Sequence, residues 1–141
     1  MKEQTEINSA LYLQAGVLPY RRKGDSLEIL IITNKKKNKW GIPKGLVDSQ
    51  YSSSDTAARE AYEEAGIRGV IRKPYAGKFS IRKWGGKCRI KVFAMEVTEV
   101  LDRWPEDMLR FREWHPVQEA AGMVKNKKLK SIILGLPELL K

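Results

Sequence analysis

The most informative segment of the chain is Arg59-Glu60-Ala61-Tyr62-Glu63-Glu64-Ala65-Gly66-Ile67. Its glutamates stand at positions i, i+3 and i+4, so a helix would gather them on one face. Ala58, Ala61 and Ala65 fall on the opposite side, where small side chains let a helix sit close against a sheet. The spacing therefore predicts a helix with an acidic face and a packing face.

The acidic face needs an explanation, because like charges at these spacings weaken a helix by a few tenths of a kcal/mol per pair. A hard divalent cation such as Mg²⁺ or Mn²⁺ prefers oxygen ligands and would offset the repulsion. A solvated acidic face in a lysine-rich protein is the alternative reading of the three glutamates alone.

The flanking residues predict where this helix begins and ends. Ser52-Ser53-Ser54-Asp55 is a cluster of residues that favour a helix N-cap, and Gly66 is a typical C-terminal stop. We therefore expect a helix over about 55–65. Trp40-Gly41-Ile42-Pro43-Lys44-Gly45, which precedes it, is rigid and turn-rich.

The rest of the chain predicts mainly strands. We expect strands over 11–20, 27–33 and 88–98, one or two strands over 67–81 with a break near Pro74, and a short strand at Trp114. Residues 21–25 and 84–87 have the composition of turns, and 102–112 that of a loop. Helical spacing over 129–136 precedes Pro137, which would end or kink that helix. This order fits an α+β fold, a mixed sheet sandwiched between helices (α/β/α).

Length and composition narrow the function. The chain has 141 residues and a net charge of +10, which fits one soluble domain over 1–141 with an anionic partner. Cys88 is its only cysteine and His115 its only histidine, which excludes disulfide frameworks and zinc clusters. The polar N-terminus and the lack of a membrane-length apolar run lead us to expect a cytoplasmic protein with no membrane contact.

Together, Gly45, Arg59, Glu60, Glu63, Glu64, Gly66 and Ile67 match the box of the Nudix hydrolases, G-x5-E-x7-R-E-U-x-E-E-x-G-U, where U is a bulky aliphatic residue. The match departs at Tyr51, where the box has Glu, and at Ala61, where it has an aliphatic residue. The sequence over about 13–121 also resembles the diphosphoinositol polyphosphate phosphohydrolase branch, and the Trp40–Gly45 loop resembles diadenosine polyphosphate hydrolases.

The resemblance implies a Nudix fold, with the box as a loop-helix-loop, and a role for each matching residue. Glu60 and Glu64 correspond to metal ligands, with the Gly45 carbonyl as a further ligand for Mg²⁺ or Mn²⁺. Glu63 corresponds to the catalytic base, and Arg59 to the arginine that orients the helix carboxylates.

Basic residues outside the helix are candidates for binding substrate phosphates. Arg89 and Arg112 match phosphate-binding positions of the inositol branch. Lys44 lies beside Gly45, and Arg82 and Lys87 flank the predicted hairpin. That branch has basic residues on the first strand where this chain has Leu13-Gln14.

The resulting hypothesis is a metal-dependent pyrophosphohydrolase that cleaves phosphoanhydride bonds in diphosphoinositol or diadenosine polyphosphates. Two alternatives stay open: a polyanion-binding Nudix module with weak or no hydrolysis, and an RNA 5′-end pyrophosphohydrolase. The sequence does not give the oligomeric state.

Overall fold

The computed structural model describes residues 10–141, apart from the side chain of Pro74. Its strands are β1 (Leu11–Lys23), β2 (Ser26–Thr33), β3 (Trp40–Gly41), β4 (Lys44–Leu46), β5 (Ile67–Lys83), β6 (Gly86–Val100) and β7 (Arg112–Pro116). Its helices are α2 (Ser53–Glu60), the π-helical turn η1 (Ala61–Ala65), α3 (Val117–Met123), α4 (Lys127–Leu134) and α5 (Leu136–Leu139).

The seven strands form one mixed sheet. Five of them lie in the order β3-β2-β1-β6-β5, and β4 and β7 pair with β1 and β2 outside this path. β1 runs parallel to β6 and antiparallel to β2, and β4 pairs with β1 where Gly45 lies opposite Ala15. β7 pairs with β2, which brings Arg112 opposite Ile32. The pairing places β4 and the segment before β7 near the same end of the central strands.

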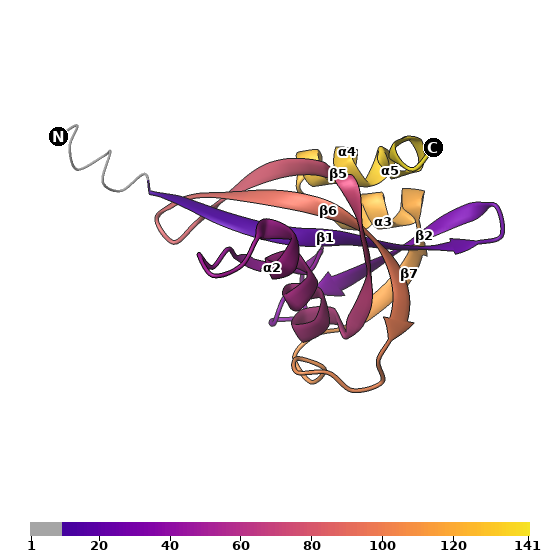
Figure 1. Ribbon diagram of the computed structural model, residues 1–141, viewed down its shortest axis with the longest axis horizontal. Coiled ribbons are helices and arrows are strands. Elements are labelled where there is room, and N and C mark those ends of the chain that lie inside the picture. The colour runs from indigo at the N-terminus through magenta and orange to yellow at the C-terminus, as the bar shows by residue number, and fades with distance from the viewer. Residues whose placement is uncertain (1–9) are drawn as a thin grey trace.

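Helices cover both faces of the sheet, with α2 on one side and α3, α4 and α5 on the other (Figure 1). Alternating strand residues build a separate apolar core on each side. Val17, Leu30 and Phe93 pack with the α2 alanines, whereas Leu18, Ile31 and Ile90 pack with the C-terminal helices. The predicted α/β/α arrangement is therefore confirmed.

The structure corrects several sequence-based boundaries. Residues 21–23 continue β1 instead of forming a turn, because Arg21 and Lys23 pair across the hairpin with Glu28. β5 runs as one strand through the predicted break, with an irregularity between Arg72 and Gly77. Pro137 does separate two helices, since α4 ends at Leu134 and α5 begins at Leu136. No helix among the described residues is long and apolar enough to cross a bilayer.

Candidate active site

The predicted helix forms as α2 and continues as η1. Ser52 caps its start by accepting a hydrogen bond from the Asp55 N–H, and Gly66 ends it in the left-handed region at φ 65°. Ala57, Ala61 and Ala65 are fully buried against the sheet. Glu60, Glu63 and Glu64 consequently lie away from that packing face, as the spacing predicted.

Gly45 and Glu60 approach each other so closely that only glycine fits at position 45. A Cβ added to Gly45 would lie 2.6 Å from Oε1 and 2.5 Å from Oε2 of Glu60. The Glu60 carboxylate is thus pressed against the backbone of β4. Burial raises the pKa of this carboxyl, and the charges of Glu63 and Glu106 raise it further.

Glu64 is 8% exposed and lies beside the same strand. Its Oε1 accepts a hydrogen bond from the Lys44 backbone N–H at 3.1 Å, and its Oε2 lies 3.5 Å from Nη2 of Arg110. Burial raises its pKa to about 8, whereas Arg110 and the Lys44 N–H act in the opposite direction. Desolvation outweighs the ion pair, so Glu64 holds a proton readily when no further cation is near.

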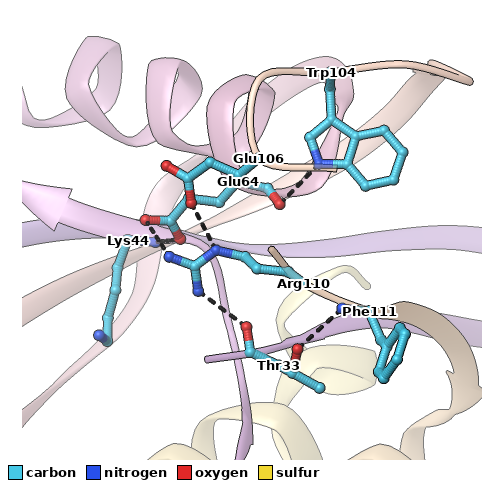
Figure 2. Close-up of polar contacts among 7 residues, drawn as sticks. All are labelled: Thr33, Lys44, Glu64, Trp104, Glu106, Arg110 and Phe111. Carbon is cyan, nitrogen blue, oxygen red and sulfur yellow. Dashed lines mark hydrogen bonds and ion pairs between the residues drawn. The ribbon is translucent and has the colours of Figure 1, made fainter. Parts of the chain in front are cut away.

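Arg110 connects this carboxylate to the loop before β7 (Figure 2). Its guanidinium pairs with Glu106 at 2.7 Å and donates to the Thr33 carbonyl at 2.9 Å. Its side chain is only 13% exposed. Sequence reasoning missed Glu106 and Arg110, because this segment read as an ordinary loop and only the sheet topology brings it to the helix.

Glu63 and Arg59 form an i,i+4 pair on the more exposed side of the helix, with Nη2 and Oε1 3.7 Å apart. The Arg59 guanidinium lies 4.4 Å from the centre of the Tyr51 ring. Tyr51 stands where the box has Glu, and here its ring stacks on Arg59. The roles of Glu63 as base and Arg59 as orienting residue stay predictions, although the two side chains are adjacent.

The C-terminal end of the helix is held by the segment between β6 and β7. Trp104 Nε1 donates to the Glu64 carbonyl at 3.1 Å (Figure 2). Arg112 Nη1 donates to the carbonyls of Ala65 and Gly66, and its Nη2 donates to that of Leu101. Arg112 also stacks on Trp104 at 3.8 Å. Arg112 was predicted to bind substrate phosphate, but in the structure its guanidinium donates hydrogen bonds to these carbonyls and positions the helix.

The other predicted phosphate contacts lie in two places. Lys44 lies beside the glutamates, and burial lowers the pKa of its ammonium. Arg89 lines a cavity on the α2 side of the sheet that none of the three glutamates lines. Arg82 and Lys87 face each other across the β5–β6 hairpin. Arg82, Lys87 and Arg89 therefore lie together on the β5–β6 hairpin and away from the carboxylates.

The donor set suits a hard divalent cation. The half-buried Glu60 and the buried Glu64 place two carboxylates beside β4, and oxygen donors of this kind are what Mg²⁺ and Mn²⁺ prefer. Burial raises the pKa of both carboxyls, and a bound cation would act in the opposite direction. Within residues 10–141, no three His, Cys, Asp or Glu side chains form a ready-made metal group, since Glu63 turns towards Arg59.

Comparison with known proteins decides the family. A model of the NUDIX domain matches residues 11–133. The chain belongs to the Nudix family. It is 30% identical over 143 residues to Nudix hydrolase 13, mitochondrial, of Arabidopsis thaliana, covering 86% of this chain and 71% of that protein. It is also 30% identical over 117 residues to diphosphoinositol polyphosphate phosphohydrolase 2 of Rattus norvegicus, covering 82% and 64%.

A solved structure supports the same fold. The binary complex of the Ap4A hydrolase from C. elegans superposes with a TM-score of 0.80 at 20% identity, covering 92% of this chain and 97% of that one. The Nudix fold and the prediction of a hydrolase acting on pyrophosphate bonds are thereby confirmed. The single domain over 1–141 and the cytoplasmic location stay predictions, and several plant relatives are named mitochondrial.

Proposed function

We propose that this Nudix hydrolase is metal-dependent and cleaves phosphoanhydride bonds in diphosphoinositol polyphosphates or dinucleoside polyphosphates. The observation that carries the proposal is the pair of adjacent carboxylates, the half-buried Glu60 packed against Gly45 and the buried Glu64 bonded to the Lys44 N–H. The names of the relatives support the substrate class, since one is a diphosphoinositol polyphosphate phosphohydrolase and another an Ap4A hydrolase.

In this proposal, Glu60, Glu64 and the Gly45 carbonyl would hold Mg²⁺ or Mn²⁺. When bound, the ion neutralises phosphate oxygens and makes a water molecule more acidic. Glu63 accepts the proton of the attacking water, which forms a new bond to phosphorus while the bridging P–O bond breaks. The departing phosphate leaves as an anion, and no covalent link to the protein is needed.

Three residues around the carboxylates hold them in position for that reaction. Arg59 pairs with Glu63 and would orient its carboxylate. Lys44 donates its backbone N–H to Glu64, and burial lowers the pKa of its ammonium. Arg110 holds Glu64 from the opposite side.

Hydrolysis by the wild type and Glu63→Gln tests the proposal. The substrates are a diphosphoinositol polyphosphate, diadenosine tetraphosphate, a nucleoside triphosphate and 5′-triphosphate RNA, each with Mg²⁺, Mn²⁺ or EDTA. We expect metal-dependent turnover that falls about 10²–10⁴-fold in Glu63→Gln with an unchanged circular dichroism spectrum. Glu138→Gln is the matched control, because that side chain is 81% exposed on α5.

The same assay separates the alternatives. A near-wild-type rate in Glu63→Gln would show that the base is another residue. Turnover confined to the RNA substrate would favour the RNA 5′-end reading. Absence of turnover by the wild type on every substrate, together with salt-sensitive binding, would favour the polyanion-binding module, which the net charge of +10 supports.

A further inference from the structure

The β5–β6 hairpin has a stripe of basic residues on the α2 side of the sheet. The pairs Lys78–Lys91, Ser80–Arg89 and Arg82–Lys87 lie directly opposite each other in three alternate rungs of the ladder. Directly opposed residues share a face, and so do residues two apart on one strand. Phe93 continues the same alternation into the core beneath α2, which fixes the side of the sheet.

This arrangement has an electrostatic cost. Like charges directly opposite each other destabilise a strand pair, and two of the three rungs pair cation with cation. Within residues 10–141, none of the five stripe cations takes part in an ion pair: Lys78, Arg82, Lys87, Arg89 and Lys91. A bound anion would remove the repulsion that residues 10–141 leave in place.

The stripe leads into a hollow beside the start of α2. One cavity of about 390 Å³ is lined by Ser52, Ser53, Ser54, Lys73, Tyr75, Lys91 and Phe93. A second of about 240 Å³ is lined by Leu13, Gln14, Val47, Ser53, Tyr75, Lys78, Arg89 and Lys91. Ser53, Tyr75 and Lys91 line both cavities, so the two are contiguous. No acidic residue lines either one.

Two features of the chain shape this hollow for an anion. The irregularity in β5 inserts extra residues between Arg72 and Gly77, and this places Lys73 and Tyr75 in the cavity wall opposite α2. The first turn of α2 forms the other wall, where the N–H groups of Ser53 and Ser54 have no partner within the helix. Lys91 packs over Tyr75 at 4.4 Å, which holds its ammonium between the two cavities.

We propose that this stripe and its hollow form a second anion site, which binds an extended chain of phosphate groups. The rungs at Lys78 and Arg82 are four strand residues apart, so the stripe spans about 13 Å. That length suits several linked phosphates and exceeds a single one. A linear polyphosphate and the backbone of a single-stranded oligonucleotide both offer this chemistry. The site is distinct from the catalytic centre, because none of the three box glutamates lines it.

Binding without metal tests this proposal separately from hydrolysis. A linear polyphosphate of about ten phosphates and a uridine oligonucleotide of about ten nucleotides are titrated into the full chain in EDTA. Calorimetry gives the affinity and amide NMR shifts give the location. We expect salt-sensitive binding of at least one ligand, with shifts centred on Ser53, Ser54 and Lys91. The ligand that binds more tightly identifies the source of the phosphates. Shifts centred on Lys44 and Gly45 instead would assign the ligand to the catalytic centre and overturn the proposal.

Paired variants control for net charge. Lys73→Ala/Lys78→Ala removes one exposed cation from each cavity and should weaken binding at least about tenfold, since each charged contact contributes more than 1 kcal/mol. Lys127→Ala/Lys128→Ala removes the same charge from α4, on the opposite face of the sheet (Figure 1). An equal loss in both variants, or no binding by the wild type, would refute the proposed site. Failure of the hydrolysis assay alone would leave these binding results intact.

Discussion

Replacing Arg110 with Leu tests whether a near-buried cation holds the carboxylate cluster together. The guanidinium lies 3.5 Å from Glu64, pairs with Glu106 at 2.7 Å and donates to the Thr33 carbonyl at 2.9 Å. The side chains of Arg110, Glu64 and Glu106 are 13%, 10% and 21% exposed. These ion pairs therefore belong to the buried regime, where removing one partner costs about 3–5 kcal/mol.

The cost should depend on pH, because the pKa of Glu64 is about 8. At pH 9 Glu64 is ionised beside Arg110, whereas Arg110→Leu raises its pKa further and leaves it either unpaired or protonated, so the loss should approach about 3–5 kcal/mol. At pH 6 Glu64 is protonated, and mainly the pair with Glu106 is lost, so the effect should be smaller. For a chain of this size, a loss of about 3–5 kcal/mol corresponds to a fall in Tm of roughly 10–17 °C.

Urea unfolding in EDTA at the two pH values measures the difference. Arg103→Leu is the matched control, since Arg103 pairs with Asp107 in the same loop at 2.9 Å but is 80% exposed. Because the Arg103 side chain lies in solvent, its pair with Asp107 should contribute no more than about 1 kcal/mol at either pH. Equal losses in the two variants at pH 9 would refute the reasoning that burial of Arg110 makes its ion pairs important.

Three further predictions concern the same cluster. Gly45→Ala should displace Glu60 and thereby weaken Mn²⁺ binding at least about tenfold, as measured by calorimetry. Gly41→Ala is the control, because nothing lies within 4 Å of the methyl group that it adds. Equal Mn²⁺ affinities in the two variants would contradict the close approach of Glu60 to Gly45. The metal-free protein should lose stability as pH rises from about 4.5 to about 8, because the folded state keeps the Glu64 proton that the unfolded state releases. Glu64→Gln should flatten the dependence on pH of the unfolding free energy measured with urea. An unchanged dependence in that variant would mean that another group titrates. Mn²⁺ at about 100 times its Kd should stabilise the wild type by about 2.7 kcal/mol, which a thermal shift assay detects. Glu60→Gln should abolish most of this stabilisation. The same stabilisation in the variant would exclude Glu60 as a ligand.

The sequence predicted the parts of the site that lie close together along the chain. Helical spacing is enough to place Glu60, Glu63 and Glu64, and the alanines between them predict which face packs. Gly45 was identified through the box. The reason for a glycine there, the approach of the Glu60 carboxylate, needed the tertiary structure.

The parts that sequence reasoning missed depend on long-range pairing. Arg110 and Glu106 reach the helix only because β7 pairs with β2, and no local pattern marks them. Arg112 was assigned to substrate because it matches a phosphate-binding position of the inositol branch, but its guanidinium donates to three backbone carbonyls, at the helix end and in the loop before β7. The sequence placed Arg89 on the strand after the hairpin and Arg82 and Lys87 beside the turn, but their pairing across the two strands depends on the register.

The anchoring of the helix end by Trp104 and Arg112 has a consequence for the order of folding. These partners follow the carbonyls that they bind by 40 to 47 residues. A short helix with mutually repelling glutamates has little stability of its own. During synthesis, the glutamate helix must therefore wait until the chain has grown past β6, because its capping donors do not yet exist. We expect truncated chains ending before Trp104 to leave the carboxylates dispersed, so that metal affinity arises late, as a property of the finished sheet.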